Sequence, residues 1–271
     1  MKIKEFIDSG EVISGFGVAA NSIKMEKVPV HEKPKQIRDE LITMNRYGYM
    51  KFEWDEFGKD FAEYAIRTDK PVLEIGSAYG WLTHRIMEKD KEIIAADICR
   101  EHLEVLLRNA PKDKLDKLHI YNARFPDEME FEKESLGAVT ASRVFHFLRG
   151  EVIEAGLDKI HQWLEPNGVF VCTNCSIYHY SVKEKLLPIY RERAANGDKW
   201  PGVVENQREF SPQHAPYTQD FLNVFDIAQF EELLPKHGFK IKKIKLFDYP
   251  SDIYSENREG HIGFVARKVS N

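Results

Sequence analysis

The amino-acid sequence predicts an α/β protein built on a doubly wound, mostly parallel β-sheet. Short apolar runs alternate with segments of helical spacing through the centre of the chain, as in successive βαβ units. Two of these runs, residues 93–96 and 169–172, are continuously apolar, which is expected of parallel strands buried on both faces. The chain has 271 residues, enough for a large core in one domain with additions.

The first 69 residues are expected to form a partly helical N-terminal extension that caps the functional site. The spacing of apolar residues predicts helices over residues 35–47 and 55–67, whereas residues 8–33 carry no regular pattern. Aromatic residues between positions 47 and 57 would add an apolar wall to a site. A secondary core or a dimer interface would account for these aromatic residues nearly as well.

From residue 70 onward, strands and helices alternate, beginning with a strand. The expected strands are residues 71–75, 92–96, 118–121, 138–141 and 169–173. The expected helices are residues 81–87, 101–109 and 152–164. A Pro-Asn-Gly sequence directly after the last of these helices stops it. Strands joined by helices favour right-handed crossovers and a sheet that is covered on both faces.

The alternation breaks after the fifth strand, where residues 176–224 are expected to form a lid-like insertion. This segment contains four prolines and many aromatic residues. Regular elements then resume with a helix at residues 227–237 and strands at residues 239–247 and 261–268. Two successive strands without a helix between them predict an antiparallel hairpin at the edge of the sheet.

Charge and composition argue against several classes of partner. A net charge of −5 and a pI of about 6.1 offer no basic surface for a nucleic acid. No segment approaches the roughly 20 apolar residues of a membrane span, and the amino terminus lacks a signal peptide's apolar stretch, so a cytoplasmic location is expected.

Cys172 and Cys175 form a Cys-x-x-Cys pair without a second pair for zinc, so they are expected to be buried thiols and no metal site is expected.

The most informative segment is residues 72–80, in which a strand ends in a glycine-containing turn that opens a helix. Such a turn lets a ligand approach the backbone, and Asp97 at the end of the next strand lies where nucleotide-binding α/β folds bind ribose hydroxyls. A phosphate-binding loop requires Gly-Lys-Ser/Thr, but Trp81 follows Gly80. A dinucleotide fingerprint requires Gly-x-Gly-x-x-Gly, but Ala78 and Trp81 occupy its later glycine positions.

The same segment resembles motif I of class I S-adenosylmethionine-dependent methyltransferases, in which an acidic residue precedes Ile-Gly-x-Gly-x-Gly. Ala78 replaces the middle glycine of that motif. Residues 94–98 resemble the family's second motif. Residues 121–123 lie where the family often has Gly-Asp-Ala, with Asn122 in place of the aspartate.

This resemblance covers about residues 70–175 and 226–268, so residues 70–271 would form a methyltransferase domain. It implies S-adenosylmethionine as the cofactor and a seven-stranded sheet of order 3-2-1-4-5-7-6 with strand 7 antiparallel. The cofactor would lie across the carboxyl ends of strands 1, 2 and 4. The residues implied to bind it are Glu74, Gly76, Ser77, Ala78, Gly80, Asp97, Ile98, Asn122, Ala123 and Arg143.

The resemblance also implies direct methyl transfer to a small-molecule or lipid-like acceptor without a metal ion. The sulfonium is already an activated leaving group, so alignment of the acceptor and exclusion of water are the main tasks. Ser142 stands where a magnesium-dependent enzyme would need an aspartate, and the Asn/Asp-Pro-Pro-Tyr and Pro-Cys signatures of other classes are missing. The candidate catalytic residues are His179 and His146, as general bases, and Tyr178.

Two alternatives remain open. A fold does not determine an activity, so the chain is also compatible with a catalytically inactive methyltransferase-like module that binds a partner. Ala78 and Asn122 depart from the family pattern in that direction. An NAD-dependent oxidoreductase would bind NADH and not the sulfonium. A homodimer is compatible with the sequence.

Overall fold

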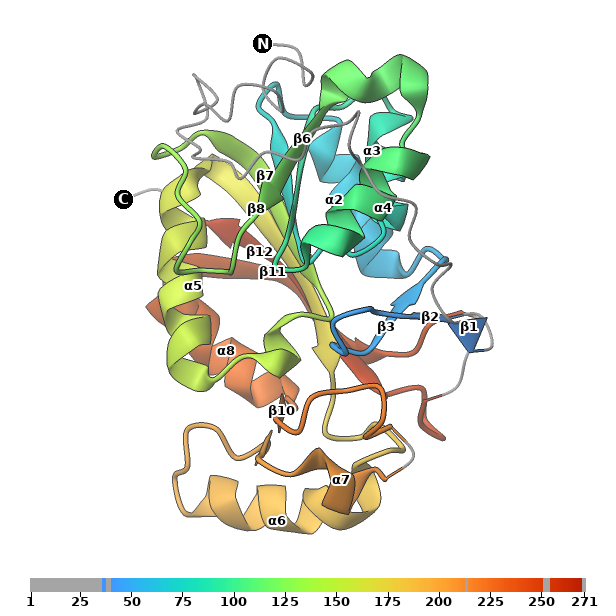
Figure 1. Ribbon diagram of the computed structural model, residues 1–271. Coiled ribbons are helices and arrows are strands. Elements are labelled where there is room, and N and C mark those ends of the chain that lie inside the picture. Colours follow the sequence, from blue (N-terminus) through green and yellow to red (C-terminus); the bar gives the residue numbers. More distant parts are fainter. Residues whose placement is uncertain (1–35, 38–39, 213, 251–253, 270–271) are drawn as a thin grey trace.

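The computed structural model describes residues 36–37, 40–212, 214–250 and 254–269. A seven-stranded sheet lies at its centre, in the order β11-β12-β8-β7-β4-β5-β6 (Figure 1). Its strands are β4 Val72–Ile75, β5 Ile93–Asp97, β6 Leu118–Asn122, β7 Leu136–Ser142, β8 Leu164–Cys175, β11 Phe239–Phe247 and β12 His261–Lys268. Strands β4 to β8 are parallel, and β12 is antiparallel to both of its neighbours. The predicted order 3-2-1-4-5-7-6, with strand 7 antiparallel, is therefore confirmed.

Helices cover both faces of this sheet, because successive strand residues point to opposite faces and both sets are apolar. In β4, Val72 packs toward one apolar cluster and Leu73 toward the other. The first cluster includes residues of α2 Glu56–Ala65, α3 Trp81–Met87 and α4 Arg100–Asn109. The second includes residues of α5 Gly150–Trp163 and α8 Ile227–Lys236. Short 3-10 helices lie at Lys112–Lys117 and Phe145–Phe147.

The N-terminal extension differs from the prediction in its first half. The predicted helix over residues 35–47 is wrong, because β1 Gln36–Ile37, β2 Glu40–Ile42 and β3 Tyr49–Lys51 form a three-stranded antiparallel sheet. A tight turn reverses the chain between β2 and β3, and it requires the left-handed backbone of Gly48 (φ +84°). The second predicted helix is confirmed as α2, with Asp55 as its N-cap. Residues 8–33 lie outside the described residues.

The insertion at residues 176–224 forms a small unit of its own below the end of the main sheet (Figure 1). It contains α6 Lys183–Ala195, β9 Val203–Val204, α7 Gln207–Phe210 and β10 Leu222–Asn223. A separate apolar cluster holds this unit together. The insertion also braces the turn between β2 and β3, since Gly48 N donates to Tyr217 O at 3.3 Å and Arg46 Nη2 donates to Ala215 O at 3.2 Å.

No helix within the described part of the chain is both long enough and apolar enough to cross a membrane.

Phe57 is one of four buried residues of helix α2. Phe57 is fully buried, and its ring centroid lies 5.1 Å from that of Phe247. The backbone of Gly263 passes so close that a Cβ there would lie 2.3 Å from the Phe57 ring. The helix therefore docks directly on β12 and carries the preceding residues to the carboxyl ends of the strands.

We predict that Phe57→Ala lowers the free energy of unfolding by about 3–5 kcal/mol, because it removes a buried ring and leaves a cavity. Phe52→Ala is the control, since Phe52 is exposed and such surface changes stay within about 0.5 kcal/mol. Denaturant titration of both variants measures the difference. Equal losses in the two variants would contradict the docking of α2 described here.

Candidate functional site

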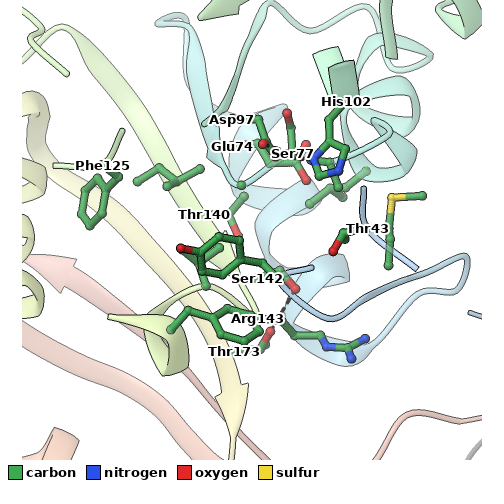
Figure 2. Close-up of a pocket in the computed structure, with 18 of the residues that line it drawn as sticks. Thr43, Glu74, Ser77, Asp97, His102, Phe125, Thr140, Ser142, Arg143 and Thr173 are labelled. Carbon is green, nitrogen blue, oxygen red and sulfur yellow. Dashed lines mark hydrogen bonds and ion pairs between the residues drawn. The ribbon is translucent and has the colours of Figure 1, made fainter. Parts of the chain in front are cut away.

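A cavity of about 590 Å³ opens at the carboxyl ends of β4, β5 and β7 (Figure 2). Its volume falls in the range of roughly 300–1,000 Å³ that is typical of small-ligand sites. The walls come from the turn after β4, the end of β5, the loop after β6, the end of β7 and residues 43–58 of the N-terminal extension. None of the lining residues belongs to the described part of the insertion, so its role as a lid stays a prediction.

Eight of the ten residues predicted to bind the cofactor line this cavity. They are Glu74, Gly76, Ser77, Ala78, Asp97, Ile98, Ala123 and Arg143. Gly80 and Asn122 are not among the lining residues. The structure therefore brings most of the predicted set together and gives the other two a supporting position.

The turn after β4 depends on its two glycines. Gly76 and Gly80 have φ of +74° and +84°, in the left-handed region that glycine adopts without strain. A Cβ on Gly76 would lie 2.5 Å from Val144, and one on Gly80 would lie 2.3 Å from Leu106. Ala78, between them, is also left-handed at φ +45°. The middle position of the motif is thus one where glycine is the natural residue and alanine is strained.

The carboxylate of Asp97 holds this turn in place. Its Oδ2 accepts from Ala78 N at 2.8 Å, and its Oδ1 accepts from Cys99 N at 2.8 Å and from His102 Nδ1 at 3.2 Å. A carboxylate offers about four acceptor positions, so one on Oδ2 remains for a ligand. Asp97 therefore has room for one hydroxyl of a bound ribose and not for both.

His102 and Tyr79 are two residues that the sequence analysis missed. His102 lines the cavity, and its Nε2 accepts from Met44 N at 3.0 Å. Tyr79 packs edge-on against the His102 ring and donates its hydroxyl to Ile42 O at 2.8 Å. Together they fasten the β2–β3 hairpin to the turn after β4. Nothing in the sequence marks His102, because a histidine on an apolar helix face is usually a core residue. Tyr79 lies in the turn after β4, at a position that motif I leaves unspecified.

Glu74 lies at the base of the cavity as a buried acid. Thr83 Oγ1 donates to its Oε2 at 2.5 Å. Burial raises the pKa of the Glu74 carboxyl to about 8, and the nearby Asp97 carboxylate contributes to that rise. Glu74 is therefore mostly protonated at pH 7. A cation bound beside it would favour its ionised form.

Ser77 presents a polar atom without a partner at the same turn. Its side chain is buried and lines the cavity, and among the described residues its Oγ has no hydrogen-bond partner. Buried hydroxyls are nearly always hydrogen-bonded in folded proteins. The Ser77 hydroxyl is therefore suited to bind a ligand in the cavity.

The other end of the turn faces a mostly apolar wall. Ile98, which is about half exposed, lines the cavity directly after β5. Phe125 and Met129 line it from the loop after β6. Asn122 has a different role, since its Nδ2 donates to Asp97 O at 2.9 Å and to Ile98 O at 3.1 Å. It holds the end of β5 rather than facing the cavity. The loop residues were missed because they lie in a segment without periodicity.

Hydroxyl groups gather at the ends of β7 and β8, on the opposite side of the cavity. Ser142 Oγ and Thr173 Oγ1 lie 3.0 Å apart (Figure 2), and Tyr249 lines the cavity with them. Arg143 follows Ser142 with a left-handed backbone (φ +61°), and its guanidinium lies 5.7 Å from the centroid of the Tyr249 ring. The sequence analysis named Ser142 and Arg143 but missed Thr173 and Tyr249 at this polar end of the cavity.

The three predicted catalytic residues lie away from the cavity. His146 Nδ1 accepts from Cys175 N at 3.3 Å, and His179 Nδ1 lies 2.6 Å from Ser181 Oγ. Burial lowers the pKa of both histidines well below the usual range. The Tyr178 hydroxyl donates to Asp226 Oδ2 at 3.1 Å. None of the three is among the lining residues, so the geometry does not support their assignment as catalytic groups.

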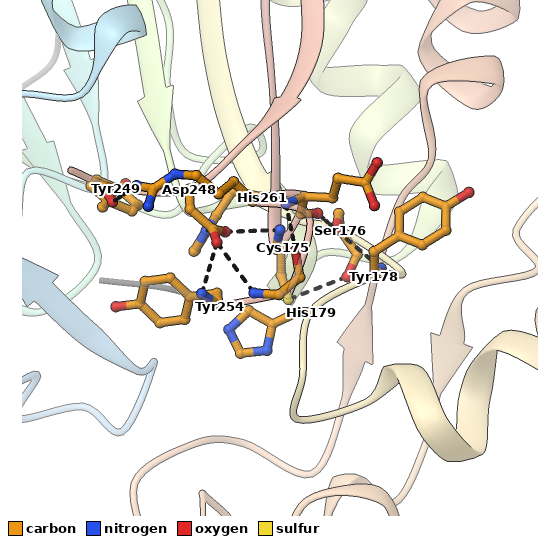
Figure 3. Close-up of polar contacts among 12 residues, drawn as sticks. Cys175, Ser176, Tyr178, His179, Asp248, Tyr249, Tyr254 and His261 are labelled. Carbon is orange, nitrogen blue, oxygen red and sulfur yellow. Dashed lines mark hydrogen bonds and ion pairs between the residues drawn. The ribbon is translucent and has the colours of Figure 1, made fainter. Parts of the chain in front are cut away.

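His179 and Tyr178 belong instead to the surroundings of a polar loop after β11 (Figure 3). The Asp248 carboxylate accepts from the backbone N–H groups of Tyr254 and Gly260, both at 2.8 Å. His179 packs against the Tyr254 ring, with 5.1 Å between the ring centroids. These contacts have a structural role, because they fold the loop that begins with Tyr249.

The Cys-x-x-Cys pair lies on β8. Cys172 is buried as predicted, whereas Cys175 is only partly buried, and burial raises the pKa of both thiols. In residues 36–37, 40–212, 214–250 and 254–269, no three His, Cys, Asp or Glu side chains are grouped so that they could hold a metal ion.

The chain is similar to methyltransferases in sequence. Residues 72–168 match a family model described as a methyltransferase domain. An uncharacterized methyltransferase of Schizosaccharomyces pombe is 32% identical over 188 residues, which cover 68% of this chain and 61% of that relative. The chain spans between 52% and 64% of the lengths of the curated relatives that it matches.

Two solved structures share the fold at low sequence identity. A S-adenosylmethionine-dependent methyltransferase from Methanosarcina mazei aligns with a TM-score of 0.59 and 12% identity, over 81% of this chain and 100% of that chain. The 1,6-didemethyltoxoflavin-N1-methyltransferase of Burkholderia thailandensis, solved with 1,6-didemethyltoxoflavin and S-adenosylhomocysteine bound, aligns with a TM-score of 0.53 and 14% identity, over 79% of each chain.

We predict that Ala78→Gly leaves the free energy of unfolding unchanged or raises it by up to about 0.5 kcal/mol. Glycine relieves the left-handed backbone at this position, which offsets the entropy that it adds to the unfolded chain. Ala110→Gly is the control: Ala110 has φ −61°, so the variant should lose about 0.4–1 kcal/mol. Chemical denaturation compares the two. A clear loss at position 78 would show that the backbone there is not strained.

Proposed function

We propose that this chain belongs to the class I S-adenosylmethionine-dependent methyltransferase superfamily and binds S-adenosylmethionine. It transfers the methyl group directly to a small-molecule or lipid-like acceptor, without a metal ion. The observation that carries the proposal is the cavity that joins the turn after β4 to the Asp97 carboxylate. That cavity combines binding groups for an adenosyl moiety with a second, polar end that has hydroxyls of its own.

The polar and apolar side chains around the cavity fit S-adenosylmethionine. The open acceptor position on Asp97 Oδ2 suits one ribose hydroxyl. Glu74 suits the positively charged methionine end, because a cation stabilises its carboxylate form. The Ser77 hydroxyl adds a free hydrogen-bonding group, and Ile98 with Phe125 supplies an apolar wall for the adenine.

The bound cofactor supplies a methyl group on a sulfonium that is already an activated leaving group. The residues of the chain then need to align the acceptor and to exclude water. The β2–β3 hairpin is placed for the second task, because Tyr79 and His102 hold it against the turn after β4.

The acceptor would occupy the end of the cavity near Ser142, Thr173 and Tyr249. Aromatic side chains of the extension, including Tyr49 and Trp54, line the same space and suit an apolar acceptor of small size. Direct transfer without a metal ion is proposed because a serine occupies the end of β7, where a magnesium-dependent enzyme would need a carboxylate ligand.

We predict that calorimetry detects binding of S-adenosylmethionine and S-adenosylhomocysteine, and no binding of NADH. Asp97→Ala should weaken the affinity for both by about 1–3 kcal/mol, the scale of losing a hydrogen bond to a charged group. Asp116→Ala, at an exposed position, serves as the control. An absence of heat with either adenosyl ligand would favour the partner-binding module, and unchanged affinity in a folded Asp97→Ala protein would refute the ribose assignment.

We further predict that binding of S-adenosylmethionine at pH 7 releases a proton from Glu74. The free protein holds this carboxyl mostly protonated, because its pKa of about 8 lies above the pH. The bound cation lowers that pKa, so the proton leaves. Calorimetry in buffers of different ionisation enthalpy counts the protons, and Glu74→Gln should show a smaller release. The same proton count in both proteins would contradict this assignment.

A further inference from the structure

The acidic groups around the cavity differ in what they already bind. Glu74 is mostly protonated and receives a hydrogen bond from Thr83. Asp97 is engaged by the turn and by α4. Glu53 pairs with Lys51, whose Nζ lies 3.5 Å from its Oε1. Asp127 also lines the cavity, but it is exposed to solvent in the loop after β6. None of these four carboxyls is therefore well placed to take a proton from a methyl acceptor.

Asp55 is different, because one of its two oxygens is open. Its Oδ1 accepts from Phe57 N at 2.7 Å and from Gly58 N at 2.8 Å, as the N-cap of α2. Its Oδ2 accepts no hydrogen bond from any residue in the described ranges. The side chain is 7% exposed and lines the cavity. A buried carboxylate is thus oriented by its cap bonds, with a second oxygen left for a ligand.

Asp55 lies on the acceptor side of the cavity. Phe57, two residues after Asp55, packs against Gly263, and Gly263 pairs with Thr173 near the end of β8. Ser142 Oγ and Thr173 Oγ1 lie 3.0 Å apart at the ends of β7 and β8, and both residues line the cavity together with Tyr249. The turn after β4 and the Asp97 carboxylate form the other side of the site. Asp55 therefore faces the space where an acceptor, and not the adenosyl group, would lie.

We propose that Asp55 Oδ2 is the general base that takes the proton of an acceptor carrying an O–H or N–H group. This inference rests on the proposed methyl transfer. A lone pair of the acceptor's heteroatom forms the bond to the methyl carbon, and the carbon–sulfur bond breaks with its electron pair going to sulfur. The acceptor's proton passes to Asp55 Oδ2 and from there to solvent, so that atoms and charges balance.

The charges around Asp55 are consistent with this role. Burial raises the pKa of Asp55 above its usual 3.8, and the neighbouring Glu56 adds to the rise, while the two cap bonds and Arg143 oppose it. The other titratable or charged residues that line the cavity are Tyr47, Tyr49, Lys51, Glu53, Glu74, Asp97, His102, Arg124, Asp127, Arg143, Arg149 and Tyr249. A carboxylate with a raised pKa is a better base near neutral pH, and it remains ionised once the pH exceeds that pKa.

The test uses two ligands that differ at the reacting centre. Sinefungin carries an amino-bearing carbon in place of the sulfonium and its methyl group, whereas S-adenosylhomocysteine carries a neutral thioether. The charged amine of sinefungin would lie beside Asp55 Oδ2, so wild-type protein should prefer sinefungin. This preference should decline as the pH is lowered through the pKa of Asp55, because the carboxylate becomes protonated.

The decisive variant is Asp55→Asn, which keeps an N-cap acceptor of similar quality and nearly the same shape. We expect the variant to lose about 10- to 100-fold in sinefungin affinity, the range for a hydrogen bond between charged groups, and to keep its affinity for S-adenosylhomocysteine. Asp226→Asn is the matched control, because Asp226 caps α8 and does not line the cavity.

The other outcomes overturn the inference in distinguishable ways. Equal loss of both ligands in Asp55→Asn would place the carboxylate at the amino-acid end of the cofactor. Unchanged affinity for both would remove Asp55 from the reacting centre. If wild-type protein binds neither ligand, the proposed function itself fails, and the general base fails with it.

Discussion

The site depends on one buried carboxylate at the end of a central strand. Asp97 accepts from the backbone of Ala78, which holds the turn after β4 in its left-handed form, and from Cys99, which begins α4. It also accepts from His102, whose other ring nitrogen accepts from Met44 in the N-terminal extension. A turn, a helix and a hairpin that are far apart in the chain are thus positioned by one side chain. Since it is buried, each of these bonds is strong and costly to lose.

This arrangement couples the parts of the protein that surround the cavity. The β2–β3 hairpin is fastened on one side by Tyr79 and His102 and on the other by the insertion, through Arg46 and Gly48. The insertion therefore contacts the hairpin, and none of its described residues lines the cavity. A ligand that changes the hydrogen bonds of Asp97 would also change the position of this hairpin, because His102 links the two. The hairpin in turn forms part of the proposed acceptor wall.

The predicted sheet was confirmed because its strands are short, apolar and separated by helical segments, and that pattern is local. The β1–β3 sheet was missed because its strands have only two or three residues, too few to show a period of two. The sequence did offer one sign of a hairpin here, since Gly48 can form a turn directly before the strand β3. His179 and His146 were chosen for the chemistry of the imidazole and for their places after the fifth and fourth strands, and both are buried outside the set of residues that line the cavity.

The sequence by itself determined the order of strands and helices, the two glycines of the turn after β4 and the acid at the end of β5. These features follow from backbone geometry and from hydrophobic periodicity, which act between residues close in the chain. Only the tertiary structure decided which acids remain open to a ligand. Asp55 and Asp97 are both aspartates after irregular or strand residues, yet one keeps a free oxygen and the other is nearly saturated. Hydrogen bonding and burial depend on partners distant in sequence, and these are brought together only when the chain has folded.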